Sequence, residues 1–242
     1  MSKVLVVIPA RYGATRFPGK PLELLWGKPM VQHVWERCQA AEGVDRVVVA
    51  TDDTRILKAC AGFGAEAVMT DPALPSGTDR VAAAAKDTPG YEIVLNVQGD
   101  EPMMEPEVIG AVAKLMQKDN LQIGTAVVPT FVDKELERPH VVKAVVAHDG
   151  RALYFSRSVI PFLRNQPASG TIHNRHLGIY GFRSDVLEQL VRLPMSPLEQ
   201  VESLEQLRWL ESGYTIHTVA VQSRSVGVDT PEDLLNLSLR TP

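Results

Sequence analysis

Three cations stand close together near the start of the chain: Arg11, Arg16 and Lys20 share the stretch 8–22 with several glycines and prolines. The apolar, β-branched run 4–8 before them predicts a buried parallel strand, and the glycines and prolines keep the following residues out of a helix. Ligands of open α/β sheets bind at the carboxyl ends of the strands, where a polyphosphate needs cations and free backbone N–H groups. The stretch therefore predicts a loop that binds the phosphates of a nucleoside triphosphate. The alternative is an ordinary solvated basic loop.

Two aspartates stand at positions where a metal ion could join such phosphates. Asp100 follows the strand-like run 93–97, and Asp229 lies before a helix that Thr230 and Pro231 begin. Mg²⁺ prefers one or two carboxylates completed by phosphates and water, so an aspartate beside a triphosphate loop is sufficient for it. Taken alone, Asp100 is equally well explained as a turn residue or a helix N-cap.

The segment 76–80, Ser-Gly-Thr-Asp-Arg, has the small residues of a turn at the start of a helix. Its N–H groups and Arg80 could contact a base, a ribose or a phosphate, although an ordinary capped helix explains Ser76 to Asp79 equally well. The chain contains no G-x-x-x-x-G-K-[ST], and no G-x-G-x-x-G follows the first strand. Their absence argues against a P-loop NTPase and against a dinucleotide-dependent dehydrogenase.

Apolar periodicity places these groups in a doubly wound α/β sheet. Strand-like and helical stretches alternate up to about Thr125, which is the βαβαβ pattern, and beyond it strand-like stretches with little helix predict an antiparallel extension. The expected strands cover 4–8, 44–50, 66–69, 93–97, 141–147, 152–156, 177–182 and 214–221. The expected helices cover 30–38, the residues between the caps at 51–53 and Gly64, 78–86, 198–210 and 231–239.

Length and composition limit the remaining function classes. A chain of 242 residues with 45% hydrophobic content can bury one α/β core but is short for two independent domains. A net charge of −4 gives no basic field to hold nucleic acid or an anionic membrane. The two cysteines, Cys38 and Cys60, form no C-x-x-C motif and fit a reducing cytoplasm. No signal-peptide cleavage site and no run near the roughly 20 apolar residues of a bilayer span is present, so we expect a soluble protein.

Three motifs resemble those of one enzyme family: P-A-R-Y-G-A-T-R-F-P-G-K-P-L at 9–22, N-V-Q-G-D-E-P at 96–102 and G-V-D-T-P-E-D-L at 227–234. The first resembles the N-terminal signature of cytidylyltransferases that activate acidic sugars, and more narrowly that of the 3-deoxy-manno-octulosonate (Kdo) cytidylyltransferases. Arg16 and the run 17–21 favour this branch over the sialic acid branch. The resemblance extends over about residues 4–239.

The resemblance implies a fold, a reaction and an assembly. The implied fold is the three-layer αβα, Rossmann-like fold of nucleotide-diphospho-sugar transferases, a mixed and mostly parallel sheet with a smaller antiparallel dimerisation extension. We expect a single domain, 1–242, in which 1–125 and 213–242 mainly bind CTP and 130–210 mainly bind the sugar and form a homodimer. The implied reaction joins CTP and Kdo to give CMP-Kdo and pyrophosphate, for lipopolysaccharide biosynthesis in the cytoplasm. Around 164–175 the chain looks shorter than many members. The stretch 164–174, with its Asn, Pro, Ser and Gly residues, is the best candidate for a mobile loop.

The resemblance also implies roles for single residues. The expected catalytic residues are Arg11, Lys20, Asp100 and Asp229, the two aspartates as ligands of Mg²⁺. The expected nucleotide-binding residues are Pro9, Ala10, Arg11, Thr15, Arg16, Lys20, Ser76, Gly77, Arg80 and Gln98. The expected sugar-binding residues are Gln98, Arg157, His176, Tyr180 and Glu205, of which Arg157 would take the sugar carboxylate. Taken alone, most sugar-side candidates are more often core or surface residues, and Arg16 can instead form a structural ion pair.

Two alternative functions remain open from the sequence. One is a cytidylyltransferase for another acidic sugar, either an amino-substituted Kdo or a sialic acid. The other is a CTP-binding regulatory module without turnover. Such a module predicts a damaged metal site, whereas Asp100 and Asp229 are both present.

Overall fold

The computed structural model describes residues 2–13, 17–118, 120–131, 134–165 and 173–240. Two of the predicted site residues, Thr15 and Arg16, lie outside the described residues. The same holds for 166–172, which make up most of the predicted mobile loop.

Strand β1 (Val4–Ala10) shows why the molecule has three layers. Its side chains point alternately to the two faces of the sheet. Val4 and Ile8 belong to the apolar core on one face, Leu5 and Val7 belong to the core on the other, and all four are fully buried. A strand that is apolar on both faces has to be covered on both sides. The αβα arrangement that the sequence predicts is confirmed.

The strands form one sheet in the order β11-β7-β10-β6-β1-β4-β5, with β8 joined to β10 and β9 joined to β8. Neighbours along the main order are parallel except at β10, which runs antiparallel to both β6 and β7. The mixed, mostly parallel sheet is therefore also confirmed. Besides β1, the strands are β4 (Arg46–Thr51), β5 (Ala67–Met69), β6 (Ile93–Asn96), β7 (Ile123–Thr130), β8 (Lys143–Val146), β9 (Ala152–Ser156), β10 (His173–Arg183), β11 (Ile216–Ala220) and the separate ribbon of β2 (Leu24–Leu25) and β3 (Lys28–Pro29).

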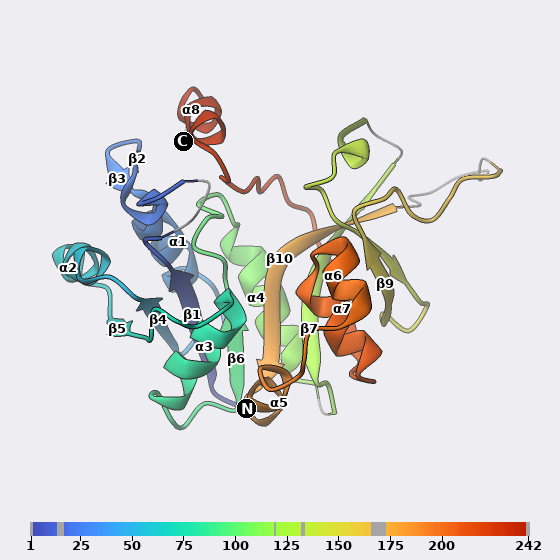
Figure 1. Ribbon diagram of the computed structural model, residues 1–242, viewed down its shortest axis with the longest axis horizontal. Helices are drawn as coiled ribbons and strands as arrows, with labels where there is room; N and C mark the ends of the chain where they lie inside the picture. The colour runs from blue at the N-terminus through green and yellow to red at the C-terminus, as the bar shows by residue number, and fades with distance from the viewer. Residues whose placement is uncertain (1, 14–16, 119, 132–133, 166–172, 241–242) are drawn as a thin grey trace.

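Helices cover both faces of this sheet (Figure 1). Helices α1, α2 and α4 contribute to the core on one face, and α3, α5 and α7 contribute to the core on the other. Helix α8 instead joins a small third core with Phe17, Leu25 and Met30. The helices are α1 (Met30–Gln39), α2 (Thr54–Gly62), α3 (Gly77–Lys86), α4 (Pro106–Met116), α5 (Ser184–Leu190), α6 (Pro197–Glu202), α7 (Glu205–Glu211) and α8 (Pro231–Ser238), with 3-10 turns η1 (Lys20–Leu22) and η2 (Lys134–Glu137).

Side-chain caps mark where helices α2, α3 and α8 begin. Asp53 accepts the backbone N–H of Arg55 at the start of α2. Ser76 caps α3 in the same way, and Thr230 forms a reciprocal capping box at α8. Such caps satisfy N–H groups that lack a partner within the helix. The caps that the sequence predicts at these helices are confirmed.

One predicted helix is broken in two. The leucine pattern predicts a single helix over 198–210, but Ser203 has φ 52° and ψ 48°, the left-handed conformation, and separates α6 from α7. The carboxylate of Glu202 accepts hydrogen bonds from Ser156 Oγ at 2.6 Å and from the Arg157 N–H at 3.0 Å. The end of α6 is thus tied to β9, and the chain turns there instead of continuing the helix.

The antiparallel extension is continuous with the central sheet. Strand β8 pairs with β9 and also with Asn174 and Arg175 at the start of β10, which then runs between β6 and β7. The pairing of β10 with β7 shifts register between His176 and Tyr180, so residues 177–179 stand outside that ladder. Strand β10 therefore connects the extension directly to the centre of the molecule.

Candidate active site

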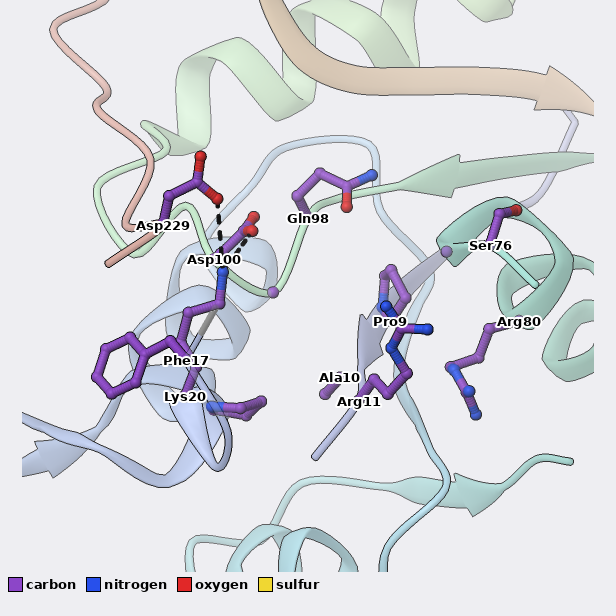
Figure 2. A pocket seen from close by; sticks show the side chains of 13 residues that line it. Pro9, Ala10, Arg11, Phe17, Lys20, Ser76, Arg80, Gln98, Asp100 and Asp229 are labelled. Carbon is purple, nitrogen blue, oxygen red and sulfur yellow. Dashed lines mark hydrogen bonds and ion pairs between the residues drawn. The ribbon is translucent and has the colours of Figure 1, made fainter. Parts of the chain in front are cut away.

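A cleft of about 330 Å³ lies at the carboxyl ends of β1 and β6 (Figure 2). Its size is within the range of small-molecule sites, and its place is where open α/β sheets bind ligands. The predicted residues that line it are Pro9, Ala10, Arg11, Lys20, Ser76, Gly77, Arg80, Gln98, Asp100 and Asp229. Phe17, Pro21 and Gly99 complete the lining without having been predicted.

Lys20 connects the two predicted metal ligands. Its Nζ lies 2.7 Å from Asp100 Oδ2 and 4.0 Å from Asp229 Oδ1, and it donates to the Val228 carbonyl at 2.9 Å (Figure 2). The lysine side chain is 12% exposed, whereas the side chains of Asp100 and Asp229 are 34% and 44% exposed. The ammonium therefore compensates the carboxylates from the protein side and leaves them accessible from the cleft.

The two carboxylates fit a hard divalent cation. Both lie within 4.0 Å of the same nitrogen, so they can face one bound ion. Within the described ranges, no group of three or more His, Cys, Asp or Glu side chains is placed to hold a metal. A cation at Asp100 and Asp229 would have to complete its coordination with phosphate oxygens and water, which is the habit of Mg²⁺.

Two arginines bring positive charge to the opposite side of the cleft. Arg80 is almost fully buried, with its Nη2 3.3 Å from Asp52 Oδ2 and a further hydrogen bond to Thr70 Oγ1. Burial lowers the pKa of Arg80, Asp52 opposes this effect, and Arg11 adds to it. Because an arginine keeps its charge despite such shifts, the exposed Arg11 and the fixed Arg80 favour an anion between them.

Close packing brings the loop after β1 against the loop after β6. A Cβ atom at Gly99 would lie 2.6 Å from the carbonyl oxygen of Pro9, so glycine is required at this point. The cationic loop itself is closed by a hydrogen bond from Gly19 N–H to Tyr12 O at 2.8 Å. The guanidinium of Arg55 stacks on the Tyr12 ring at 3.4 Å from its centre. These contacts bring the cationic loop and Asp100 to the same cleft.

Two of the predicted sugar-binding residues, His176 and Tyr180, belong to an aromatic cluster and do not line the cleft. His176 and Tyr180 lie with ring centres 5.3 Å apart, and His176 Nε2 is 3.0 Å from Thr125 Oγ1. Desolvation lowers the pKa of His176 to about 3, and burial raises the pKa of Tyr180. In the described part of the chain the Tyr180 hydroxyl is buried without a hydrogen-bond partner. A buried hydroxyl in this state is a candidate for a bond to a ligand.

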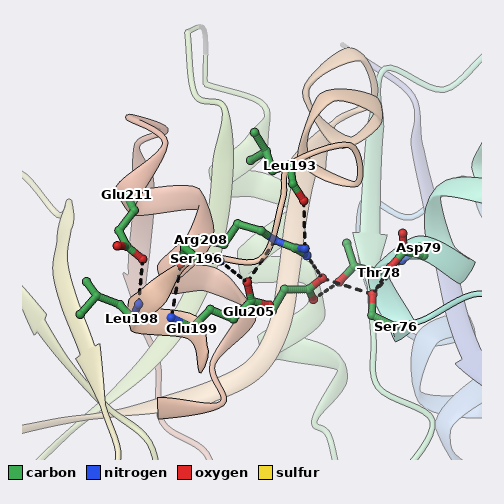
Figure 3. A network of polar contacts seen from close by, with 10 residues as sticks. All are labelled: Ser76, Thr78, Asp79, Leu193, Ser196, Leu198, Glu199, Glu205, Arg208 and Glu211. Atoms are coloured by element: carbon green, nitrogen blue, oxygen red, sulfur yellow. Dashed lines mark hydrogen bonds and ion pairs between the residues drawn. The ribbon is translucent and has the colours of Figure 1, made fainter. Parts of the chain in front are cut away.

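Glu205 joins the extension to the start of α3 (Figure 3). From the first turn of α7 it accepts hydrogen bonds from Ser76 Oγ at 3.2 Å and from Thr78 Oγ1 at 2.5 Å. Arg208 donates to it at 2.6 Å. Burial raises the pKa of Glu205, and these three donors oppose the rise. Glu205 is therefore held next to Ser76, which lines the cleft.

Arg157 is placed differently from the other candidates. Its guanidinium donates to the backbone carbonyls of Pro139, Glu202 and Ser203, at 2.8, 2.7 and 3.1 Å. These bonds hold the end of α6 and occupy the guanidinium. Arg157, like His176, Tyr180 and Glu205, is not among the residues that line the cleft. Its predicted contact with a sugar carboxylate gains no support from this geometry.

Glu101 is a residue that sequence reasoning missed. Desolvation and the neighbouring Asp100 raise the pKa of Glu101 to about 7, and Ser225 Oγ donates to it at 3.2 Å. The only sequence signal is its place directly after Asp100 in the 96–102 motif. Its partners lie far away in the chain, so no local pattern points to them.

Comparisons with known proteins agree with this geometry. Residues 5–216 match the cytidylyltransferase family. Similar relatives are the 3-deoxy-manno-octulosonate cytidylyltransferases of Myxococcus xanthus, 50% identical over 96% of this chain and 94% of that protein, and of Anaeromyxobacter dehalogenans, 51% identical over 97% and 96%. A solved structure of CMP:2-keto-3-deoxy-manno-octonic acid synthetase complexed with CTP has a TM-score of 0.91 and 44% identity, covering 98% of this chain and 97% of that one. A Leptospira borgpetersenii cytidylyltransferase, 17% identical with a TM-score of 0.66 over 98% and 86% of the two chains, shares the fold.

The mixed sheet and its cleft of cations and aspartates define a nucleotidyltransferase. The chain belongs to the cytidylyltransferase family, among the 3-deoxy-manno-octulosonate cytidylyltransferases. Over the residues that the structure describes, no helix combines the length and apolar character needed to cross a bilayer.

Proposed function

We propose that the enzyme transfers the cytidylyl group of CTP to Kdo and releases pyrophosphate. The observation that carries this proposal is the meeting of Lys20 with Asp100 and Asp229 in a cleft that Arg11 also lines. Support comes from the names of relatives about half identical over nearly the whole chain, and from a similar structure that contains CTP.

The chain's own groups supply position and charge for this reaction. The anomeric hydroxyl of the sugar attacks the α-phosphorus of CTP in line, a new P–O bond forms, and the bond to the bridging oxygen of the leaving pyrophosphate breaks. The proton of the attacking hydroxyl passes to the solvent or to the released pyrophosphate. Arg11 and Lys20 stabilise the negative charge on the phosphates. Because positioning and electrostatics carry phosphoryl chemistry, no covalent nucleophile is required.

Asp100 and Asp229 are the residues that would hold Mg²⁺. When bound, Mg²⁺ supplies Lewis-acid neutralisation of phosphate charge. Lys20 orients Asp100 through a direct hydrogen bond of 2.7 Å and lies near Asp229. The lysine thus organises the carboxylates and contributes its own charge to the phosphates.

We assign Gln98, His176, Tyr180 and Glu205 to the sugar side. Gln98 lines the cleft, and Glu205 is bonded to Ser76, which also lines it. The unpartnered Tyr180 hydroxyl is suited to one of the many sugar hydroxyls. Arg157 is left outside this set, because its donors already bind three carbonyls.

The alternatives are less well supported. Relatives that are about half identical are named for Kdo, which favours Kdo over a sialic acid or an amino-substituted Kdo. A regulatory module without turnover would tolerate a damaged metal site, whereas Asp100, Asp229 and Lys20 meet in the cleft. We further propose that the enzyme works as a homodimer in the cytoplasm and serves lipopolysaccharide biosynthesis.

Pyrophosphate release tests the function directly. The enzyme is incubated with CTP, Mg²⁺ and one of a panel of acidic sugars: Kdo, its amino-substituted analogue and a sialic acid. We expect release with Kdo at the highest kcat/KM, since the relatives are named for that sugar. Release with a sialic acid alone would contradict the sugar assignment, and no release with any acidic sugar would contradict the reaction.

A further inference from the structure

Asp229 stands at the end of a segment without regular secondary structure, residues 221–229, which we call the strap. The strap leads from β11 to α8 and passes beside the loop after β6 (Figure 1). Asp100, in contrast, follows closely on a buried strand. On the α8 side, the Asp229 N–H donates to Asp233 Oδ2 at 3.1 Å. On the other side, the spacing between the two aspartates depends on what holds the strap.

Two carboxylates after β6 bind the strap. Glu101 Oε2 accepts a hydrogen bond from Ser225 Oγ at 3.2 Å. Glu105 accepts bonds from Ser223 Oγ at 2.6 Å and from the Arg224 N–H at 2.8 Å. Ser225 is 2% exposed, so water competes little for its hydrogen bond.

Strand β10 contacts both the strap and Glu101. Arg175 donates to the carbonyls of Ser223 and Ser225 at 3.0 and 3.2 Å. The Gly178 N–H bonds to the Glu101 carboxylate, and a Cβ at Gly178 would lie 2.6 Å from Glu101 Oε1. Gly178 is one of the residues outside the β7 ladder, and its lack of a side chain leaves room for the carboxylate.

The last residues of the strap are hydrogen-bonded to Asp100. The Val228 N–H donates to the Asp100 carbonyl at 2.8 Å, and Lys20 Nζ contacts the Val228 carbonyl at 2.9 Å. The nearest side-chain anchor before this point is the bond between Ser225 and Glu101. Because Ser225 is only a few residues from Asp229, the loss of this hydrogen bond would loosen the position of Asp229.

We propose that Glu101 is a positioning residue, which binds Ser225 and Gly178 and thereby holds Asp229 opposite Asp100. Glu101 acts through the strap, since its carboxylate oxygens are used by partners on the strap and on β10. The inference rests on the proposed function, because the spacing of the pair matters to the reaction only if both aspartates bind the metal.

Hydrogen–deuterium exchange on protein without metal or nucleotide tests the anchor itself. We expect Glu101→Gln and Ser225→Ala to speed exchange of the amides at 225–229 by about threefold to tenfold, the effect of one weakened or lost hydrogen bond. Exchange in β1 should stay at the wild-type rate. Ser238→Ala is the matched control, because its hydroxyl bonds only within α8, to the Leu235 carbonyl.

Kinetics test the consequence for the pair. In both variants we expect the Mg²⁺ concentration for half-maximal rate to rise by about threefold to tenfold, with the KM for the sugar unchanged. Wild-type exchange and a wild-type Mg²⁺ requirement would overturn the proposal. Faster exchange without a higher Mg²⁺ requirement would also overturn it, as would an equal rise in the sugar KM with a general loss of thermal stability.

The proposed function and the role of Glu101 are tested by different results. A wild-type enzyme that releases no pyrophosphate from CTP and an acidic sugar overturns the proposed function. Variants that match an active wild type in strap exchange and Mg²⁺ requirement overturn only the role of Glu101.

Discussion

At the scale of single residues, Lys20 and Arg11 supply positive charge to the cleft from its two sides. Lys20 is mostly buried and bonded to Asp100, so its charge is fixed where the phosphates would bind. We expect Lys20→Ala and Arg11→Ala each to lower kcat/KM for CTP by about 100-fold, the usual effect of removing one preorganised charge contact. The KM for the sugar should change little. Initial rates with CTP varied at saturating sugar measure the effect.

Lys28→Ala is the matched control for this experiment. Lys28 of β3 forms an exposed ion pair with Glu36 of α1 at 2.8 Å, and neither residue lines the cleft. A defect confined to the sugar KM in the Lys20 and Arg11 variants would contradict the role of the loop. A loss in the Lys28 variant of the same size would point to a general effect of charge.

His176 links a single residue to the pH dependence of stability. Desolvation lowers its folded-state pKa to about 3, so below the ordinary pKa of about 6.5 the unfolded chain binds a proton that the folded protein does not. The stability from this residue is present above that ordinary pKa and is lost as the pH falls toward 3. When the pH falls from 7 to 5, we expect the free energy of unfolding of wild type to decrease by about 2 kcal/mol more than that of His176→Phe.

Urea unfolding of both proteins at the two pH values measures this difference. The exposed His148 supplies the control, since His148→Phe removes a histidine that is not enclosed. Equal losses of unfolding free energy in wild type and in His176→Phe would show that His176 does not titrate in this way.

At the scale of the elements, the backbone conformation of Ser203 causes the break between α6 and α7, which the leucine pattern does not indicate. Ser203 adopts the left-handed conformation at φ 52°, which a β-branched side chain tolerates poorly. We expect Ser203→Val to reduce the free energy of unfolding by about 1–2 kcal/mol. Ser212→Val is the control, because Ser212 is likewise exposed at a helix end but has φ −85°. Equal urea midpoints for the two variants would contradict the explanation.

Sequence reasoning succeeded where local signals decide the structure. The run 4–8 is apolar on both faces and lies within β1, and the caps Asp53, Ser76 and Thr230 start helices as predicted. The cleft likewise gathers loops at strand ends, where general rules place ligands. Strand ends therefore indicated the cationic loop and the two aspartates, whereas the family resemblance supplied Pro9, Ala10 and Gln98.

The remainder depends either on a local pattern that two structures share or on contacts between distant parts of the chain. Helix α4 was not predicted, because adjacent apolar residues at 108–109 and 115–116 do not distinguish a helix from a strand. Arg157 binds carbonyls of segments that only the fold brings near, and Glu101 meets Ser225 across 124 residues. No pattern within one segment indicates such partners.

At the scale of the whole molecule, the exposed apolar side chains are unevenly distributed. Among the described residues, most of the large exposed ones lie between 131 and 201, and Leu153 on β9 and Val201 on α6 are 55% and 83% exposed. A concentration of exposed apolar side chains in one part of the chain is what a subunit interface would cover. It supports the proposed homodimer, formed through the extension.

Light scattering at micromolar concentration measures the assembly. We expect a mass near twice the 26.5 kDa of one chain, and a shift toward one chain for Val201→Asp, because a charge would be buried at the contact. Lys118→Asp, at an exposed position after α4 and outside 130–210, controls for added negative charge. A wild-type mass near 26.5 kDa would contradict the homodimer.

The most direct test of metal-assisted cytidylyl transfer compares pyrophosphate release by wild type and Asp100→Asn, with CTP, Kdo and varied Mg²⁺. The substitution keeps the shape of a partly exposed side chain, so circular dichroism should show an intact fold. We predict release by wild type that stops when Mg²⁺ is chelated, and a rate at least about 100-fold lower in the variant. Wild-type rates for Asp100→Asn at limiting Mg²⁺ would contradict the assignment of this cleft as the catalytic site.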